Sequence, residues 1–593
     1  MRTASPRFLV ALAATVLLGC SGGGGGGGTP PPQSTVIVGL AGSAPTGTSV
    51  SLTWNASSRF SSYRVFRNDV EIATTSTASY SDTGLTPVTA YRYFVRGVTS
   101  AGLSDPSATI TVTTPNMLTL SLARLIDPAA RSYLMVRDVA FDSAGAIYLA
   151  GGAFSANFPT TAGAYDRTFA SGGASTGSEG PSDVFVMKVS RSGQVLWSTL
   201  IGGPNHDRAY GVEIAPDGGV IVAGRAGEGF PTTPGVAQPA FAGDTNPNRA
   251  YGRQDGFIAK LSADGSSLLW STYFGDSQSG FLRDVAVDSN NKVYVAGVFF
   301  AGLPHITGNA RQAAPNGAHD LVYARLSAAA STVEYGSYLG GAEPAGETAG
   351  TPSIAVSPSR DVFVAVAEGG SGAPTSATAF RRNNAGSQDF LVARFSPADQ
   401  LVYATYLGGS GDEGLETHNI AVDDANRVAI AAVSASTNYP TTSGAYQPLF
   451  GGGGTDGVIS ILSADGSSLV ASTYFGGAGP EEVEGVAFAP DGLLYLSGGT
   501  GSSSLRTTSN AFRQNFSGVE DAFIAGLLPD LRGAPYVSFI GGTDADLAHA
   551  IDIAPDGAIA VVGHTVSPNF PVSVGGSTTP NGPFTGWHAL LVP

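Results

Sequence analysis

The sequence contains a single cysteine, Cys20, among 593 residues. One cysteine cannot form an internal disulfide, so stability must rest on packing and hydrogen bonds. Charged residues make up only 13% of the chain, and 46 acidic residues face 30 basic ones, for a net charge of −16. Binding along a nucleic acid backbone needs a basic stripe, so this balance argues against nucleic acid as a partner. P-loop and HExxH motifs are absent too, and no catalytic signature is found.

Glycine, proline and apolar residues are abundant by contrast. The chain has 81 glycines and 36 prolines, and 42% of its residues are hydrophobic. Glycine is about twice its usual ~7%, which indicates many tight turns. The prominence of Val, Ile, Phe and Tyr favours strands. The chain is also longer than one ordinary domain, so we expect an all-β protein with several domains or a repeat array.

The longest apolar run lies at the N-terminus, from Phe8 to Leu18, after two arginines. It is too short for a comfortable transmembrane helix and predicts a signal peptide over residues 1–19. The sequence LLGC at 17–20 resembles the bacterial lipobox, and this resemblance implies lipidation of Cys20 and anchoring to a membrane. Ser21 after the cysteine implies sorting to the outer membrane of the cell envelope, with either a periplasmic or a surface-exposed position. The alternative is an ordinary signal peptide with a chance cysteine.

Two segments separate this region from the rest of the chain. Residues 20–33 (CSGGGGGGGTPPPQ) predict a lipidated cysteine followed by a Gly/Pro tether. Residues 34–115 hold short alternating strands, with Trp54 in the second strand and LTPVTAY ending at Tyr91. These features and the closing TITVTT resemble a fibronectin type III domain, a β-sandwich in which the tyrosine at Tyr91 would form the tyrosine corner. Its expected role is that of a spacer.

From residue 117 to 593 the chain repeats. Segments of the form (V/I)-x-(V/I/F) begin at Val139 and return six times, at intervals of 65 to 73 residues. Each is followed by a turn, a second strand, a long loop, a third strand and a short turn. A fourth strand then ends in a phrase such as STYFGG (472–477), which occurs in six variants. Four short strands per repeat, seven times over, are typical of a seven-bladed β-propeller.

The fifth repeat, NYPTTSGAYQ (438–447) through STYFGG, resembles the family of bacterial beta-propeller (SBBP-type) repeats. The resemblance implies the architecture and little about function. We expect blades over approximately 127–203, 204–276, 277–342, 343–410, 411–478, 479–543 and 544–593. The last repeat ends before a fourth strand, whereas the strand-like segment 117–126 (MLTLSLARLI) precedes the first blade. We therefore predict that 117–126 completes the last blade by strand exchange and closes the ring.

An aspartate opens the third strand of six repeats. These residues stand about one repeat apart, so a ring would spread them out rather than gather them at one centre. We expect a structural role in turns, through hydrogen bonds to backbone amides. They are Asp183, Asp255, Asp320, Asp389, Asp456 and Asp521.

The loops between successive repeats are acidic. In a propeller they lie on the same face as the long loops, around the central channel, where they would form a negative rim for a ligand or for Ca²⁺. The alternative is a set of solvated loop charges. The rim candidates are Asp412, Glu413, Glu416, Glu481, Glu482, Glu484, Asp544 and Asp546.

We therefore expect a membrane-anchored, exported, non-catalytic binding, adhesion or scaffold protein that displays a propeller face to a glycan or protein ligand. Two other hypotheses stay open. One is a carbohydrate-active enzyme that uses paired carboxylates at the channel mouth. The other is a purely structural envelope protein. No cofactor other than Ca²⁺ is suggested.

Overall fold

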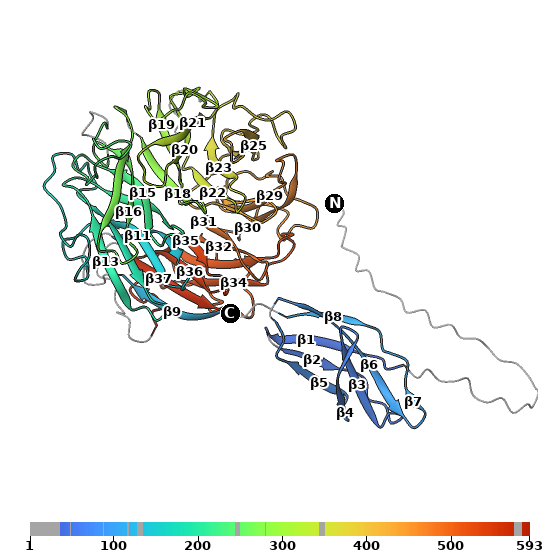
Figure 1. The fold of residues 1–593 in the computed structure, drawn as a ribbon. Coiled ribbons are helices and arrows are strands. Elements are labelled where there is room, and N and C mark those ends of the chain that lie inside the picture. The colour runs from blue at the N-terminus through green and yellow to red at the C-terminus, as the bar shows by residue number, and fades with distance from the viewer. Residues whose placement is uncertain are drawn as a thin grey trace, which may run out of the picture. The chain divides into compact units, whose positions relative to one another are not determined.

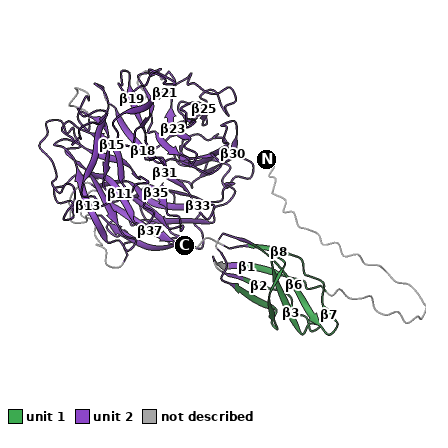
Figure 2. Cartoon of the chain, in the orientation of Figure 1, with its two compact units in different colours: residues 1–43, 51–82, 91–112 green, residues 44–50, 83–90, 113–593 purple. Residues whose placement is uncertain are grey.

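The computed structural model is all-β (Figure 1), and it describes residues 36–47, 49–86, 88–114, 118–126, 134–243, 250–278, 280–342, 350–573 and 584–593. The signal peptide 1–19, Cys20 and the tether 20–33 lie outside the described residues. The chain divides into two compact units, which Figure 2 colours separately. The smaller one comprises residues 1–43, 51–82 and 91–112, and the larger one the remainder.

The N-terminal part of the chain forms two sheets, as the sequence predicts. One sheet has the strand order β1-β2-β5 and the other β4-β3-β6-β7, with β8 also paired to β6. The strands are β1 (Ala41–Thr46), β2 (Ser49–Thr53), β3 (Ser62–Arg67), β4 (Val70–Thr75), β5 (Ser79–Thr83), β6 (Ala90–Thr99), β7 (Gly102–Leu103) and β8 (Ile110–Thr113).

The domain is built as the alternating pattern predicts, with buried and exposed residues taking turns along β3 and β6. Trp54 is buried and packs edge-on against Tyr63, with ring centroids 5.3 Å apart. Tyr91 is half-buried, with the Arg67 guanidinium 5.6 Å from its ring centroid. The fully buried Tyr93 donates a hydrogen bond to Asp82 at 2.7 Å.

The described residues after 133 form seven antiparallel sheets, each with its strands in chain order, which we name repeat sheets 1 to 7. Sheets 1 to 3 contain β10 (Leu134–Phe141), β11 (Ile147–Ala153), β12 (Asp183–Val189), β13 (Val195–Ile201); β14 (Arg208–Ile214), β15 (Val220–Ala226), β16 (Asp255–Leu261), β17 (Leu268–Phe274); and β18 (Phe281–Val287), β19 (Val293–Phe300), β20 (His319–Leu326), β21 (Val333–Leu339).

Sheets 4 and 5 contain β22 (Ser353–Val356), β23 (Val362–Glu368), β24 (Asp389–Phe395), β25 (Leu401–Leu407); and β26 (Glu413–Gly414), β27 (Ile420–Val422), β28 (Val428–Ser434), β29 (Asp456–Leu462), β30 (Leu469–Phe475). Sheets 6 and 7 contain β31 (Glu481–Phe488), β32 (Leu494–Thr500), β33 (Asp521–Leu527), β34 (Tyr536–Ile540); and β35 (Asp546–Ile553), β36 (Ile559–Thr565), β37 (Thr585–Val592). In sheet 5 the first strand is split, and both β26 and β27 pair with β28.

The segment upstream of the first repeat completes sheet 7. β9 (Thr119–Leu125) pairs antiparallel with β37, and Leu125 lies opposite Trp587. Sheet 7 thus has the order β35-β36-β37-β9, in which its fourth strand comes from the beginning of the repeat region (Figure 1). The pairing that the sequence predicts for segment 117–126 is therefore present, although residue 117 lies outside the described part.

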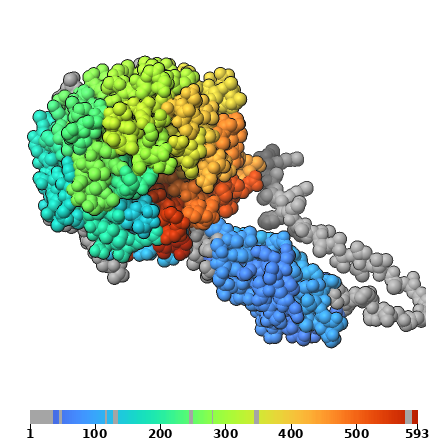
Figure 3. Space-filling model, viewed as in Figure 1, coloured from blue at the N-terminus to red at the C-terminus, as the bar shows by residue number. Residues whose placement is uncertain are grey.

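The core is divided among the junctions between sheets. In the described part of the chain, each cluster of buried apolar residues joins two successive repeat sheets. One cluster joins sheet 7 to sheet 1, so the order of packing returns to its start. The colours of Figure 3 follow the same course, and the red C-terminal residues border the blue-green residues of sheet 1. Because an isolated sheet would expose two apolar faces, each repeat depends on both neighbours.

Candidate ligand-binding site

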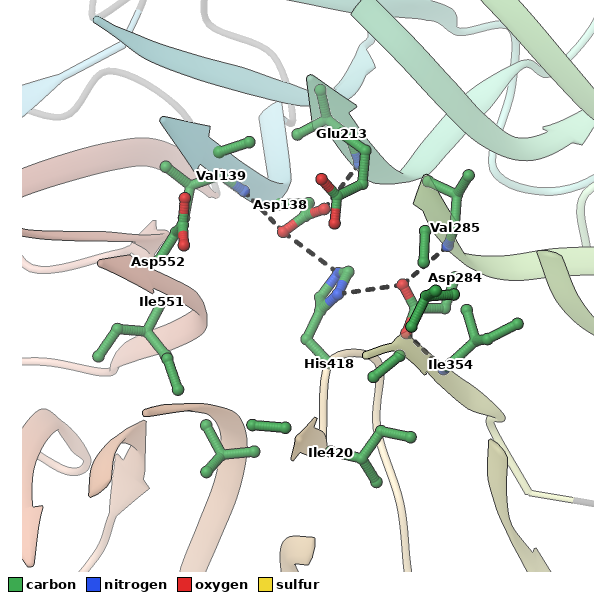
Figure 4. Close-up of a pocket in the computed structure, with 18 of the residues that line it drawn as sticks. Asp138, Val139, Glu213, Asp284, Val285, Ile354, His418, Ile420, Ile551 and Asp552 are labelled. Atoms are coloured by element: carbon green, nitrogen blue, oxygen red, sulfur yellow. Dashed lines mark hydrogen bonds and ion pairs between the residues drawn. The ribbon is translucent and has the colours of Figure 1, made fainter. Parts of the chain in front are cut away.

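A cavity of about 390 Å³ lies where the first strands of all seven repeat sheets meet. Most of the residues that line it are apolar, but the surface they present to the cavity is mainly polar, and its ionisable residues are Asp138, Glu213, Asp284, His418 and Asp552 (Figure 4). Burial raises the pKa of Glu213 well above its usual value, and the nearby carboxyl of Asp552 adds to this effect. We call this space the central cavity.

His418 lies between two carboxyl groups in the central cavity (Figure 4). Its Nε2 is 3.4 Å from Oδ1 of Asp138 in sheet 1, and its Nδ1 is 3.3 Å from Oδ1 of Asp284 in sheet 3. Nε2 also lies 3.0 Å from the carbonyl oxygen of Tyr210 in sheet 2. Burial alone would lower the pKa of His418, but Asp138 and Asp284 outweigh it and raise the pKa to about 10. One imidazolium thus links sheet 5 to sheets 1, 2 and 3.

The split first strand of sheet 5 explains how His418 reaches so far. Gly414 pairs with Val433 and Ile420 with Ile430, so the residues between them leave the ladder. His418 has a φ of 67°, which is uncommon for a residue with a side chain. Such a conformation persists where the surroundings hold it, and it brings the imidazole into the cavity.

Five other first strands carry a β-bulge at the equivalent position. One residue of the first strand has no partner on the second, and a bulge of this kind re-aims the side chain it contains. The bulged residues are Arg137, Tyr210, Arg283, Glu484 and His549. These bulges therefore bring polar side chains of several sheets together above the central cavity.

Sheets 1 to 3 contribute a basic cluster around Tyr210. The guanidinium carbons of Arg283, Arg208, Arg225 and Arg137 lie 4.2, 4.7, 5.3 and 5.8 Å from the ring centroid of Tyr210. Arg208 also donates a hydrogen bond to the Tyr210 hydroxyl. Burial alone would raise the pKa of Tyr210, but the four guanidiniums reverse the effect and lower the pKa to about 6. Ionisation of Tyr210 would partly balance the four positive charges.

A pocket of about 420 Å³ opens beside this cluster and is lined by Arg225, Tyr251, Gln254, Phe281 and Arg283, among others. The Arg225 guanidinium lies 4.1 Å from the ring centroid of Tyr251 and 4.5 Å from that of Phe281. Arg225 is the last residue but one of β15, the second strand of sheet 2, and Phe281 begins sheet 3. The pocket therefore lies at the edge where second strands end and first strands begin, which we call the loop-rich face. We call this pocket the basic pocket.

Sheets 5 to 7 carry acidic and imidazole groups instead. Nδ1 of His549 lies 2.5 Å from Oε2 of Glu484, and its Nε2 lies 2.8 Å from Nδ1 of His564. Glu482 and Glu520 line a second pocket, of about 460 Å³, which we call the acidic pocket. Burial raises the pKa of Glu482 to about 8, and the neighbouring carboxyl groups of Glu484 and Glu416 contribute.

The eight predicted rim residues do not form one exposed rim. Asp412 and Asp544 are exposed, and Glu416 and Glu482 are partly exposed. The remaining four are buried: Glu413, Glu481, Glu484 and Asp546. Among the described residues, no group of three or more His, Cys, Asp or Glu side chains is placed to hold a metal ion.

Glu413, Glu481 and Asp546 instead hold the ends of the repeated phrase. Each carboxyl accepts a hydrogen bond from the second glycine of that phrase, as Glu481 does from Gly477 at 3.0 Å. Asp207 does the same in sheet 2. A Cβ on the first glycine, Gly476, would stand 2.3 Å from Oε2 of Glu481 and 3.1 Å from Oδ1 of Asp456. The first glycine is therefore enclosed by carboxyl groups, whereas a Cβ on the second, Gly477, would stand 2.6 Å from Cβ of Ser502.

The six repeat aspartates are fully buried at the start of the third strands. One oxygen of each accepts a hydrogen bond from a backbone amide in the loop before it, and the donors are Ala170, Ala242, Asn316, Ala385, Gly451 and Ser517. Sheet 7 has Thr585 at this position. Each aspartate therefore fixes the long loop of its own sheet.

Sequence reasoning missed the basic cluster, although a signal existed. Arg137-Asp138 and Arg283-Asp284 recur as RDVA in two first strands, in a chain with few charges. The inward register of first strands would have placed these residues near one another. Arg208, Arg225 and Tyr251 have no counterpart motif, because Tyr251 meets the two arginines only when the long loop before β16 folds back over sheet 2.

Comparison with known proteins identifies the N-terminal domain. Residues 30–113 match the Fibronectin type III domain family. Over 86 residues the chain is 49% identical to Exoglucanase B of Cellulomonas fimi, covering 14% of this chain and 8% of the relative. It is 40% identical over 123 residues to the Poly(3-hydroxybutyrate) depolymerase of Ralstonia pickettii, covering 19% of this chain and 24% of the relative. The chain thus spans less than a quarter of either protein.

Among solved structures, the Fn3-like protein from Clostridium thermocellum is similar to this domain. It is 30% identical, with 14% of this chain and 93% of that chain covered, at a TM-score of 0.13. In the part of the chain that the structure describes, no helix is long and apolar enough to cross a membrane.

Proposed function

We propose that this protein is an exported, non-catalytic carbohydrate-binding protein that presents a seven-bladed β-propeller on a fibronectin type III spacer. In this proposal the seven repeat sheets are the blades, β9 closes the ring, and the loop-rich face binds the ligand. A lipid on Cys20 anchors the protein to the outer membrane, and residues 20–33 are the tether. No nucleic acid is bound.

The basic pocket is the observation that carries this function. Ligand sites are concave, combine aromatic and apolar walls with a few polar groups, and occur where elements meet. The basic pocket has two aromatic side chains, two guanidiniums and one amide in about 420 Å³, between sheets 2 and 3. Its polar groups are donors and an amide acceptor, not a pair of carboxylates, which favours binding over hydrolysis.

The names of similar proteins also support a carbohydrate ligand. Exoglucanase B and the similar Chitinase D of Niallia circulans, which is 46% identical over 80 residues, both have names that refer to polysaccharide substrates. The likeness concerns the fibronectin type III domain. It supports a role beside polysaccharides, and we place the ligand-binding site itself in the repeat sheets.

Glycan-array binding tests the proposal. The purified chain should bind a restricted set of glycans, and changing Tyr251 to Ala should abolish binding without lowering the melting temperature by more than a few degrees. Arrays with added Ca²⁺ and with a chelator test whether the partly exposed carboxyls of Glu416 and Glu482 take part. An array without any bound glycan, at every Ca²⁺ level, contradicts a carbohydrate-binding function and favours a purely structural envelope protein.

Membrane anchoring has its own test. Cys20→Ala should move the protein from the membrane fraction to the soluble periplasmic fraction and remove incorporation of labelled palmitate. Ser21→Ala retains the thiol and serves as the matched control. Retention of the Cys20→Ala protein in the membrane fraction contradicts the anchor.

A second candidate function, glycoside hydrolysis, is favoured by one observation in the acidic pocket. Glu482, whose burial raises the pKa to about 8, is protonated at neutral pH as a general acid must be. Glu520 lines the same pocket and would be its partner. Release of reducing ends from the bound glycan, lost in Glu482→Gln, would support hydrolysis, whereas intact glycan after long incubation supports binding alone.

A further inference from the structure

The basic pocket has more positive charge than its described neighbours neutralise. Among the described residues, neither Arg225 nor Arg283 forms an ion pair with a carboxylate. The Nε atom of each is buried and has no hydrogen-bond partner there. Arg225 is only 4% exposed. An ionised Tyr210 offsets only one of the four positive charges around it, and a buried guanidinium without a carboxylate partner is costly, so a bound anion would lower that cost.

The two aromatic rings limit the shape of that anion. Arg225 lies close to both Tyr251 and Phe281, with its guanidinium carbon 4.1 and 4.5 Å from their ring centroids. Cation–π contacts of this kind cover the faces of the guanidinium, so its N–H groups remain available at the edge. An edge of N–H donors matches the oxygens of a carboxylate or sulfate. Arg283 lies within 4.9 Å of the Phe281 ring and adds a second positive charge.

Gln254 places a second, independent requirement on the ligand, which must supply a hydrogen-bond donor. Nε2 of Gln254 lies 3.1, 2.9 and 3.0 Å from the carbonyl oxygens of His206, Tyr251 and Arg253, so both of its hydrogens have acceptors. Its Oε1 is buried, and the residue is 3% exposed, yet this oxygen accepts no hydrogen bond from the described residues. Gln254 lines the basic pocket, so its orphan acceptor needs a donor such as a ligand hydroxyl. A bare inorganic anion would leave this acceptor unmatched.

We infer that the basic pocket binds an acidic sugar, a uronate residue of a glycan, with its carboxylate between Arg225 and Arg283 and a hydroxyl donating to Oε1 of Gln254. This inference rests on the proposed carbohydrate-binding function and names the class of glycan. An oligonucleotide fits less well, because the four arginines form one compact cluster rather than a track along successive phosphates. The cluster matches one anionic group on a polyhydroxylated ring.

Paired ligands isolate the role of the carboxylate. Titration calorimetry of the whole chain against oligomers of galacturonate, glucuronate and mannuronate is compared with titration against their methyl esters, which keep the hydroxyls and lose the charge. At least one uronate oligomer should bind, and its ester should bind at least tenfold more weakly. Inorganic sulfate alone should compete only weakly, because it cannot satisfy Gln254.

Variants locate the contact. Arg225→Gln and Arg283→Gln should each weaken uronate binding at least tenfold, and Gln254→Leu should do the same. Arg253→Gln makes the same charge change at a nearby partly exposed residue that pairs with Glu228 at 2.9 Å, so its binding should stay within twofold. If Arg225→Gln melts at a much lower temperature, Arg283→Gln and Gln254→Leu still test the site.

The results of these experiments distinguish an acidic-sugar site from carbohydrate binding in general. Equal binding of uronates and esters, unchanged in Arg283→Gln and Gln254→Leu, overturns the acidic-sugar site while carbohydrate binding stands. Binding of neutral glycans alone does the same. An absence of binding to all uronates, together with a silent glycan array, overturns both.

Discussion

Oδ2 of Asp552, in the last repeat sheet, accepts a hydrogen bond of 2.7 Å from the backbone N–H of Phe141 in the first. Equivalent bonds join other neighbours: Asp138 accepts from Val212 at 2.6 Å, and Asp284 accepts from Ile354 at 2.9 Å. Sheets 7 and 1, which are far apart in sequence, are therefore joined as sheets 1 and 2 are. The junction between the last and the first repeat sheet thus contains this bond, and sheet 7 is completed by β9.

The β9 strand should be essential for the stability of the larger unit. Leu122 in β9 is 5% exposed, whereas its neighbour Ser121 is exposed. Leu122→Asp buries an unpaired carboxylate and should lower the free energy of unfolding by about 3 kcal/mol or more. Ser121→Asp adds the same charge on the outer face and should change it by less than about 0.5 kcal/mol. Denaturant titration measures both.

Deleting residues 117–126 should have a larger effect than either substitution, because β37 would keep β36 but lose β9 on its other side and become an open edge. Differential scanning calorimetry should show a lower melting temperature for the repeat sheets, and the chain should become prone to association. An unchanged melting temperature would mean that the ring does not depend on strand exchange.

His418 should be a stabilising residue of the central cavity. Its removal leaves the buried carboxyls of Asp138 and Asp284 without their shared cation. Breaking a buried ion pair in this way typically costs about 3–5 kcal/mol, so we expect His418→Ala to lower the free energy of unfolding by about 3 kcal/mol. Asp424→Asn, at an exposed turn of the same sheet, is the control and should have little effect.

The pH dependence of that variant gives a sharper test. The folded pKa of His418, about 10, is above the usual value of about 6.5, so its contribution is complete below about pH 6.5 and is lost as pH rises through about 10. The difference in stability between wild type and His418→Ala should therefore be constant in mild acid and shrink in alkali. If the stability difference between wild type and His418→Ala grew with pH, His418 would not be a protonated imidazolium in the folded protein.

The paired carboxyl groups at the sheet junctions should make the protein more stable in mild acid than at alkaline pH. Burial raises the pKa of Asp183 to about 8, that of Asp207 and Glu413 to about 7, and that of Asp546 to about 6. Their contribution is complete below the unfolded value of about 4 and is lost as pH rises through these folded values.

Each such proton corresponds to a slope of about 1.4 kcal/mol per pH unit over its window. The free energy of unfolding should therefore fall between about pH 5 and about pH 8. The double variant Asp389→Asn, Glu413→Gln retains the hydrogen bonds with neutral groups and should reduce that fall. Asp412→Asn, at the exposed residue beside Glu413, should leave the slope unchanged.

The strand order was accessible from sequence because it depends on local patterns. Alternation of apolar residues and the turn after each second strand mark every repeat, and the missing fourth strand at the C-terminus pointed to β9. The role of the repeat aspartates followed from their spacing, since groups a whole repeat apart cannot share a centre. These inferences need no knowledge of which side chains meet across a sheet junction.

The candidate site was not accessible in the same way. Glu413, Glu481 and Asp546 stand in acidic loop sequences, which usually indicate solvent exposure, yet each closes on a glycine amide and is buried. Arg225 and Tyr251 come within 4.1 Å only because a long loop folds back over sheet 2. A β-bulge is likewise invisible in the sequence, although it decides that Tyr210 turns into the basic cluster.

Tyr210 should ionise far below the other tyrosines of the chain. The basic cluster lowers its pKa to about 6 against burial, whereas burial raises the pKa of other tyrosines such as Tyr273. At about pH 8 the ultraviolet spectrum should show tyrosinate absorbance equivalent to one residue, and Tyr210→Phe should remove it. Arg283→Gln takes away the nearest guanidinium and should shift the titration upwards, while Arg253→Gln should not. A spectrum that shows tyrosinate only near about pH 10, the unperturbed value, would mean that the four arginines have another counter-ion.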